Sequence, residues 1–298
     1  SLIDIQSITT IVRQSLLTMR LEGEGINAAR VSLLTNVHLD TKTEKIDDRG
    51  KEAASGLTSL FFGYGISFLL YIMIAIYGQS IMRGVLEEKT NRVAEVVVAS
   101  VKPDVLLAGK ILGSGLVAVT QVCAWLSMSL IMYFVRVPIL KAFGAAPALI
   151  GGAIKIPSIA PLAAVALFLF FVLGFVFYAS LFAAVGSMVS NQEDIQGAAT
   201  PVMLMLVSSI IFMQSVLLNP SSTLARVMSL LPFSAPIMMP LRMALVAVPW
   251  FEIVGGIASV VVGCVAAIWL SARIYRVGLL MYGKRPSFKE LGRWIRMA

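Results

Sequence analysis

Charged residues are scarce in this chain: Asp, Glu, Lys and Arg make up 13% of its 298 residues, whereas 58% are hydrophobic. This composition is that of a membrane protein and leaves no room for a large soluble catalytic domain. The two cysteines, Cys123 and Cys264, lie in apolar stretches, and the one histidine, His38, has no second metal-binding residue nearby. We therefore expect no disulfide, no metal site and no cofactor.

Long apolar stretches are the main feature that the sequence does contain. A helix needs about 20 apolar residues to cross a bilayer, and a backbone in hydrocarbon must satisfy its own hydrogen bonds as a helix. The predicted spans are residues 57–82, 111–135, 159–189, 201–218 and 251–272. Only Glu252, at the edge of the last span, is charged. The sequence thus predicts an all-α polytopic membrane protein with a transmembrane domain over residues 57–276.

Two polar appendages flank this domain. Residues 1–56 are predicted as the end of a small external α+β domain, with a helix over 5–19, a strand over 31–39 and a solvated connection over 40–52, although a plain spacer remains an alternative. Residues 277–298 are predicted as a basic amphipathic helix on the lipid surface, or else a disordered basic tail. The chain begins without Met or a leader, so we expect a fragment that lacks a first, sixth span.

The distribution of basic residues predicts the orientation. Residues 83–110 and the chain after Ala272 hold twelve Lys and Arg residues, against five in the loops on the other side. The positive-inside rule therefore places residues 83–110 and the C-terminus in the cytoplasm and residues 1–56 outside. We expect a multi-pass protein of the inner (plasma) membrane, and we read the net charge of +8 as a topology signal and not as a sign of nucleic-acid binding.

The external stretch 220–249 is apolar but rich in proline, which prevents a continuous spanning helix. It is predicted to form two short re-entrant helices, over 224–231 and 237–246. Arg242 within it could face a water-filled path, but we expect it to snorkel to the outer headgroups.

A second cytoplasmic loop carries two carboxylates. Ser190 and Glu193 have the spacing of a capping box, and Glu193 and Asp194 would favour the dipole of the helix that follows. We expect these acids to cap the helix and not to carry ions.

The most informative region is the polar segment, residues 83–110. Its apolar residues share one helical face, and Glu88, Arg92 and Glu95 form a charge ladder on another. Lys102 and Pro103 would end this helix, and Asp104 would cap a second helix that re-enters the membrane. The segment could anchor on the membrane surface, but the ladder favours a protein partner.

At these residues the chain resembles a known family. The sequence GVLEEKTNRVAEVVVASVKPDVLLAGKILG from Gly84 resembles the cytoplasmic signature of ABC transporter permeases of the ABC-2 type, and in particular the NatB-like branch associated with sodium efflux. The resemblance extends to AVGSMVSNQEDIQ from Ala184 and LLPFSAPIMMPLRMAL from Leu230, and so covers most of the chain after Leu57. It implies a coupling helix that docks on a separate ATP-binding subunit, and a second permease chain, identical or not.

The resemblance also implies which residues form the ATPase-coupling interface: Glu87, Glu88, Lys89, Arg92, Glu95, Lys102, Pro103, Gly109 and Lys110. The chain has no G-x-x-x-x-G-K-[ST] motif, so ATP must be hydrolysed by the partner. The predicted function is therefore the permease subunit of an ATP-driven exporter, surrounded by membrane lipid.

Two other functions were weighed. An intramembrane enzyme is disfavoured, because the spans hold no paired acids and no histidine that could activate Ser180 or Ser208. A non-transporting sensor or scaffold that binds an ATPase remains an alternative, since its coupling helix would have the same sequence. The absence of acids within the spans also weakens the sodium assignment.

Overall fold

The structure is a computed structural model that describes residues 44–46, 52–91, 100–142 and 160–278. The chain divides into two units, residues 1–43 and 44–298, and the described residues all belong to the second. The elements are β1 (Glu44–Ile46), β2 (Glu52–Ser55), α3 (Gly56–Thr90), α5 (Pro103–Ala142), α7 (Pro161–Met188), η1 (Gln192–Asp194), α8 (Ile195–Leu218), α9 (Thr223–Leu230), α10 (Ala235–Leu245) and α11 (Trp250–Gly278).

Five of these helices, α3, α5, α7, α8 and α11, are long and apolar enough to cross a membrane. The predicted helical, polytopic fold is confirmed. Two of the five begin with a proline, Pro103 in α5 and Pro161 in α7. Proline suits a first helical turn because its missing N–H would have no partner there.

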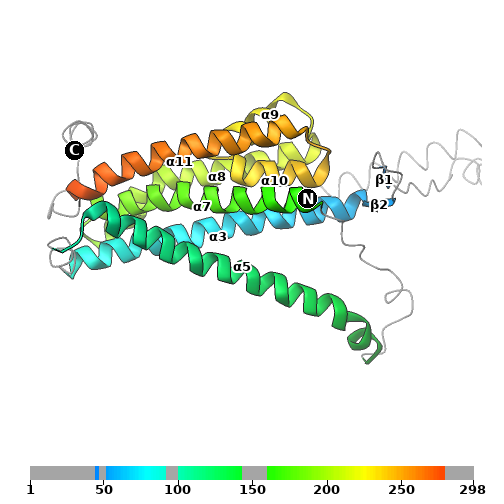
Figure 1. The fold of residues 1–298 in the computed structure, drawn as a ribbon, viewed down its shortest axis with the longest axis horizontal. Helices are drawn as coiled ribbons and strands as arrows, with labels where there is room; N and C mark the ends of the chain where they lie inside the picture. Colours follow the sequence, from blue (N-terminus) through cyan, green and yellow to red (C-terminus); the bar gives the residue numbers. More distant parts are fainter. Residues whose placement is uncertain (1–43, 47–51, 92–99, 143–159, 279–298) are drawn as a thin grey trace, which may run out of the picture. The chain divides into compact units, whose positions relative to one another are not determined.

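The long helices alternate in direction, so the bundle has two distinct ends (Figure 1). The Lys89 end is where α3, α7 and α11 finish and where α5 and α8 begin. The Arg242 end holds the opposite ends of the long helices together with α9 and α10. If each long helix spans the bilayer, these two ends face opposite sides of the membrane.

Helix α7 forms the centre of the bundle and packs against α3 and α11. Its side chains Phe170, Tyr178 and Phe182 are completely buried, and the Tyr178 hydroxyl donates a 2.7 Å hydrogen bond to the carbonyl of Phe233. A side chain at Gly186 would collide with the main-chain carbonyl of Met82. This glycine therefore lets the backbones of α3 and α7 meet closely near the Lys89 end.

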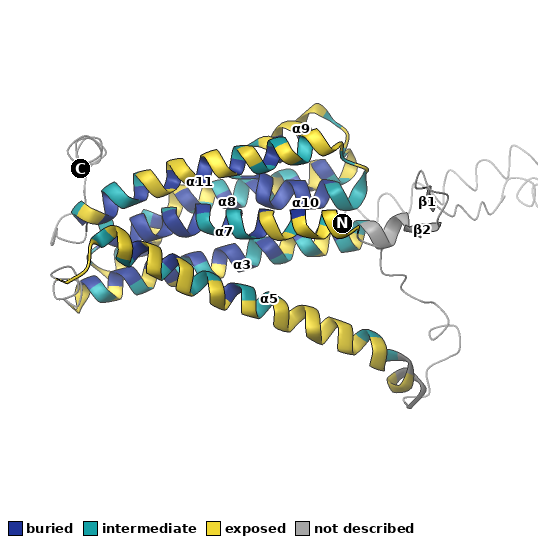
Figure 2. Ribbon diagram, viewed as in Figure 1, coloured by how far each residue is buried: buried dark blue, intermediate teal, exposed yellow. Residues whose placement is uncertain are grey.

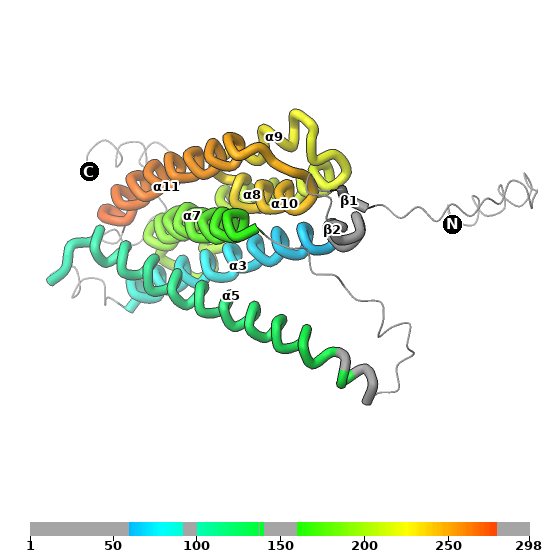
Figure 3. The backbone as a smooth tube through the Cα atoms, turned by 45° about the vertical axis from the view of Figure 1, so that its right-hand side comes forward, coloured from blue at the N-terminus to red at the C-terminus, as the bar shows by residue number. Residues whose placement is uncertain are grey.

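Helix α5 differs from the other long helices because its second half diverges from them (Figures 1 and 3). Its buried residues, Leu107, Ile111 and Ala118, all lie in its first half. In its second half Leu126 and Phe134 are 65% and 70% exposed, and most of the ribbon is coloured as exposed in Figure 2. In a membrane this apolar surface faces lipid or another chain.

The proline-rich stretch contains two short helices, α9 and α10, within two residues of the expected positions. Ser222 caps α9 by accepting a hydrogen bond from the amide of Ala225. Arg242, in α10, is only 2% exposed. The expectation that it reaches the headgroups is wrong, because its guanidinium is engaged inside the protein.

The partners of Arg242 come from three segments. Its Nε donates to the Pro220 carbonyl at 3.0 Å, Nη1 to Ser229 Oγ at 2.6 Å and Nη2 to Glu252 Oε2 at 2.8 Å. The arginine thus joins the loop before α9, helix α9 and the start of α11. Buried charges persist only when they are paired and hydrogen-bonded in this way.

Strands β1 and β2 pair antiparallel, with Glu44 opposite Ser55. They lie in or beside residues 40–52, which the sequence predicted as a solvated connection, so that prediction is wrong for β1. The predicted helix over 5–19, the strand over 31–39 and the tail after residue 278 lie outside the described residues. An external α+β domain therefore stays a prediction.

Candidate functional site

The polar segment begins as part of a spanning helix. The first predicted span was expected to end at Met82, but α3 continues to Thr90. The separate helix expected from Arg83 is wrong for residues 83–90, because no proline interrupts the helix and a single glycine, Gly84, is tolerated within it. Arg92 and Glu95 lie outside the described residues.

The predicted interface residues divide into three groups by exposure. Glu87, Lys102 and Gly109 are exposed; Glu88, Pro103 and Lys110 are half-buried; Lys89 is buried. Only the exposed group can meet a partner directly without a rearrangement of this end.

Lys89 is 1% exposed, so its side chain is buried within this chain and does not lie on its surface. It shares its helical face with the buried residues Val85 and Leu86, and its Nζ donates a 2.6 Å hydrogen bond to the carbonyl of Ser187. Ser187 is in the last turn of α7, where main-chain carbonyls lack partners within the helix. A cation at this position also complements the negative end of the helix dipole.

Glu88 and Lys110 pair with each other. The distance from Lys110 Nζ to Glu88 Oε2 is 2.6 Å, and the lysine side chain is 13% exposed. Lys110 lies over Gly84, where an added Cβ would be 4.0 Å from Nζ. These two side chains therefore connect α3 to α5 and are not free for a partner.

The start of α5 is also connected to α11. Asp104 was expected to cap this helix, but Pro103 is its first residue and the Lys102 carbonyl accepts from the amide of Leu106. Asp104 instead accepts a 2.8 Å hydrogen bond from Arg276 of α11. Its carboxylate forms an ion pair between helices in place of a cap.

The loop between α7 and α8, predicted as the second cytoplasmic loop, does not contain the expected capping box. A 3-10 turn, η1, precedes α8, and the residue at the N-cap, Asp194, makes no side-chain cap hydrogen bond. The Ser190 hydroxyl is buried and has no hydrogen-bond partner among the described residues. Glu193 is exposed and Asp194 is half-buried.

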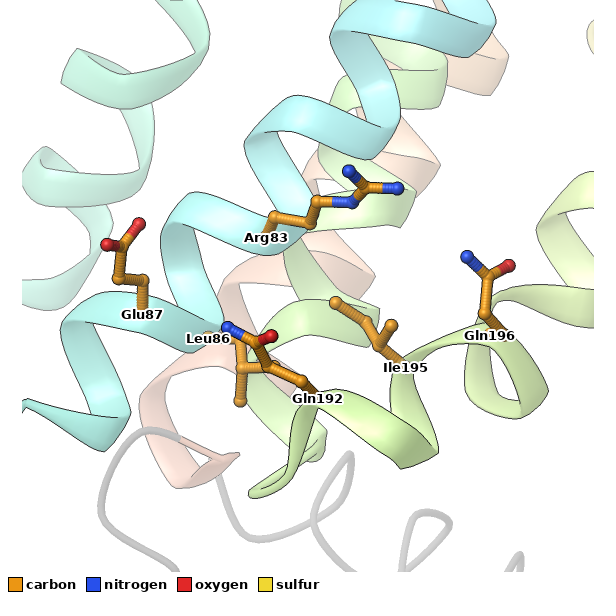
Figure 4. A pocket seen from close by; sticks show the side chains of 6 residues that line it. All are labelled: Arg83, Leu86, Glu87, Gln192, Ile195 and Gln196. Carbon is orange, nitrogen blue, oxygen red and sulfur yellow. The ribbon is translucent and has the colours of Figure 1, made fainter.

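A pocket of about 410 Å³ lies between α3 and the start of α8 (Figure 4). Its lining residues are Arg83, Leu86 and Glu87 from α3, Gln192 from η1, and Ile195 and Gln196 from α8. Leu86 and Ile195 are buried and form an apolar base, whereas the four polar side chains are exposed at the rim. In Figure 4 Arg83 extends toward the side of Gln196 and Glu87 extends away from it.

The pocket brings together two regions that the sequence treated separately, the polar segment and the loop between α7 and α8. Lys102 and Gly109 do not line the pocket but are exposed at the same end of the bundle. We call Arg83, Glu87, Gln192 and Gln196, together with Lys102 and Gly109, the candidate partner-binding surface. From the sequence, Arg83 counts only toward the predicted orientation, and Gln192 and Gln196 have no predicted role. The signal was present, since Arg83 and Glu87 are four residues apart on one helix.

The side chains around the pocket are polar and charged. Among the residues that the structure describes, no group of three or more His, Cys, Asp or Glu side chains could hold a metal ion. The surface offers charges of both signs and amide groups around an apolar base, which suits recognition of another protein.

Comparison with known proteins identifies the family. The chain matches the ABC-2 family transporter protein over residues 4–273. It is 28% identical over 284 residues to the uncharacterized protein MJ1024 of Methanocaldococcus jannaschii, covering 95% of this chain and 65% of that protein. It is 29% identical over 235 residues to the uncharacterized protein YhaP of Bacillus subtilis, covering 79% of this chain and 55% of that protein.

The chain thus spans less than two thirds of the length of both relatives. No solved structure is found to match it. The family match covers nearly all of the described bundle, and the five apolar helices agree with a membrane component of a transporter. The chain belongs to the ABC-2 family of transporter membrane proteins.

Proposed function

We propose that this protein is the permease subunit of an ATP-driven ABC exporter and that a separate ATP-binding subunit docks on the partner-binding surface at the Lys89 end. The observation that carries the proposal is the pocket between α3 and α8, with the exposed Glu87 at its rim. It places charged and amide side chains of two segments on one surface of a bundle that is otherwise mainly apolar.

The proposed mechanism follows from the helix arrangement. ATP binding closes the partner subunits, and their movement displaces the Lys89 end of the bundle. Rigid-body tilting of the long helices then exposes the transport path alternately to the two sides of the membrane. The Lys89 end is cytoplasmic in this proposal, in agreement with the excess of Lys and Arg there.

The proposal also includes the substrate, a second permease chain and the side of the membrane on which α9 and α10 lie. The NatB-like sequence motif supports sodium or a small molecule as the exported substrate. The exposed second half of α5 provides an apolar surface for a second permease chain, although lipid would also cover it. The external position of α9 and α10 follows from the same orientation.

The proposal is tested by purifying the full-length permease with a candidate ABC ATP-binding subunit. We expect Glu87→Lys combined with Lys102→Glu to abolish co-purification and ATPase stimulation, since both side chains are exposed on the partner-binding surface. Glu88→Gln is the matched control: it weakens the internal pair with Lys110 but leaves the exposed charges in place.

Membrane insertion and thermal unfolding of each variant check that the bundle remains intact. Unchanged association of the charge-reversed variant would contradict the proposed docking surface. A complex that assembles and hydrolyses ATP but moves no substrate in sealed vesicles would favour a sensor or scaffold over a permease.

A further inference from the structure

Polar contacts connect the helix ends at the Lys89 end in pairs. Glu88 of α3 pairs with Lys110 of α5 at 2.6 Å, and Asp104 of α5 pairs with Arg276 of α11 at 2.8 Å. Helix α5 is therefore joined on one side to α3 and on the other to α11.

A second set of contacts joins α3 and α11 through α7. Lys89 of α3 donates to the Ser187 carbonyl of α7 at 2.6 Å. Gly278, the last residue of α11, lies against the same serine, because a Cβ on it would be 2.7 Å from Ser187 Oγ and 2.9 Å from the Ser187 carbonyl oxygen. Ser187 is thus contacted by both neighbouring helices.

Together these contacts form a closed ring through α3, α5, α11 and α7, which we call the collar. Its residues are Glu88, Lys89, Asp104, Lys110, Ser187, Arg276 and Gly278. The ring has a practical consequence: no one of the four helix ends can move away without breaking a contact to each of two neighbours.

The members of the collar differ in their exposure to water. Asp104 and Arg276 have side chains that are 46% and 47% exposed, so water can replace their pairing at little cost. Lys89 is 1% exposed, and water cannot readily replace it at the Ser187 carbonyl. Lys89 is therefore the member whose loss should loosen the collar most.

Lys89 is also close to the partner-binding surface in the chain. It lies two residues after Glu87 on α3, so the two side chains point to different sides of the same helical turn. Glu87 is exposed, while Lys89 is buried against the end of α7, at the serine that Gly278 of α11 also contacts. Glu87 and Lys89 therefore lie within one turn of the same helix.

We propose that Lys89 is a positioning residue that joins the ends of α3, α7 and α11 into one rigid unit, so that a displacement of the partner-binding surface moves these three helices together. This inference rests on the proposed function for the source of the displacement. The rigid unit itself requires no partner.

The first experiment measures amide hydrogen exchange of the full-length chain in lipid nanodiscs. We expect Lys89→Met to raise exchange at least tenfold in the last turns of α3, α7 and α11 together and to leave α9 and α10 unchanged. Ser187→Ala is a control for the hydrogen bond itself: it keeps the carbonyl that accepts from Lys89 and removes only the hydroxyl beside Gly278, so the ends of α3 and α7 should stay protected. Faster exchange confined to α3, or no change, would overturn the proposal.

If Lys89→Met does not fold, Lys89→Gln gives the same comparison with a shorter side chain that keeps a donor and loses the charge. We expect it to raise exchange at the same three helix ends, by a smaller factor.

The second experiment separates positioning from binding in the complex with the ATPase. We expect Lys89→Met to bind the ATPase as the wild type does but to lose at least fivefold of the permease-dependent stimulation of ATP hydrolysis. Wild-type stimulation in this variant would contradict the transmitting role. If no ATPase binds the wild type, the proposed function fails, and the exchange result still decides whether Lys89 joins the helix ends.

Discussion

The two ends of the bundle are each organised around one buried cation, but the two cations act differently. Arg242 reaches a loop, a short helix and a long helix through its three nitrogen atoms, and one of its partners is the carboxylate of Glu252. Lys89 donates to a main-chain carbonyl at the end of α7. The guanidinium fork joins several segments, whereas the flexible ammonium stabilises one helix end.

This difference indicates how firmly each end of the bundle is held together. At the Arg242 end a paired charge fixes two short helices that a proline-rich sequence could not extend across the membrane. At the Lys89 end the buried cation lies on the same helix as exposed charges, with the pocket between α3 and α8 one helical turn away. The first arrangement holds its segments together on several sides, and the second places a stabilising contact beside the surface proposed to bind a partner.

The largest effect is expected from breaking the Arg242 network. Arg242→Met leaves the Glu252 carboxylate, 11% exposed, without its nearest cation, and removing one partner of a buried pair costs about 3–5 kcal/mol. Thermal unfolding of the full-length protein in nanodiscs measures the loss. Arg242→Lys should restore little of it, since an ammonium cannot reach three partners in three directions.

A double variant sharpens this interpretation. In Arg242→Met the Glu252 carboxylate keeps only the exposed Arg226, whose Nε is 3.8 Å away. Arg242→Met with Glu252→Gln removes this poorly compensated charge, so the double variant should be more stable than Arg242→Met alone. If the double variant is instead less stable by the full sum of the two single changes, the two side chains contribute independently and the network does not act as a unit.

A smaller loss is expected at the opposite end. Lys89→Met keeps most of the side-chain volume but removes the donor to the Ser187 carbonyl, and a buried acceptor left without a partner costs about 1–3 kcal/mol. The same unfolding measurement compares it directly with Arg242→Met. A larger loss for Lys89→Met than for Arg242→Met would reverse the ranking of the two ends.

The sequence allowed the fold to be predicted better than the two buried cations. Five apolar stretches of roughly the length of a bilayer crossing, with Glu252 as their one charged residue, predict five helices from the cost of burying backbone and charge, without tertiary information. The sequence does not predict the end of α3, because Arg83, the first charged residue after the apolar stretch, lies within the helix and not at its end. Charge marks the edge of a bilayer, but only a residue that disfavours helix marks the end of a helix.

The burial of Arg242 was missed for a related reason. A single arginine in an apolar stretch can extend its side chain to the headgroups. Only a buried acidic or polar partner indicates that the arginine is buried instead. Glu252 was visible as the one acid at the edge of a predicted span, so a pair between them could have been proposed. Lys89 is buried because the end of α7 packs against it. This packing cannot be predicted from the sequence of α3 alone.

Packing at the Lys89 end offers a milder way to break the collar. A Cβ on Gly278 would be 2.9 Å from the Ser187 carbonyl oxygen, so Gly278→Ala forces α7 and α11 apart slightly. We expect a loss of about 1 kcal/mol or more, as at other overpacked sites, because the carbonyl oxygen and carbon of Ser187 are main-chain atoms that cannot rotate away. Gly113→Ala is the control: its Cβ would meet nothing within 4 Å, so unfolding should show no loss.

The smallest effect is expected from the exposed pair of the collar. Asp104→Asn removes the charge that pairs with Arg276, but both side chains are nearly half exposed, so the loss should stay below about 0.5 kcal/mol. High salt should reduce even this difference, since exposed charges are screened. A loss as large as that of Lys89→Met would mean that the ion pairs, and not the buried lysine, hold the helix ends together, and the distinction between the two ends of the bundle would then rest on Arg242 alone.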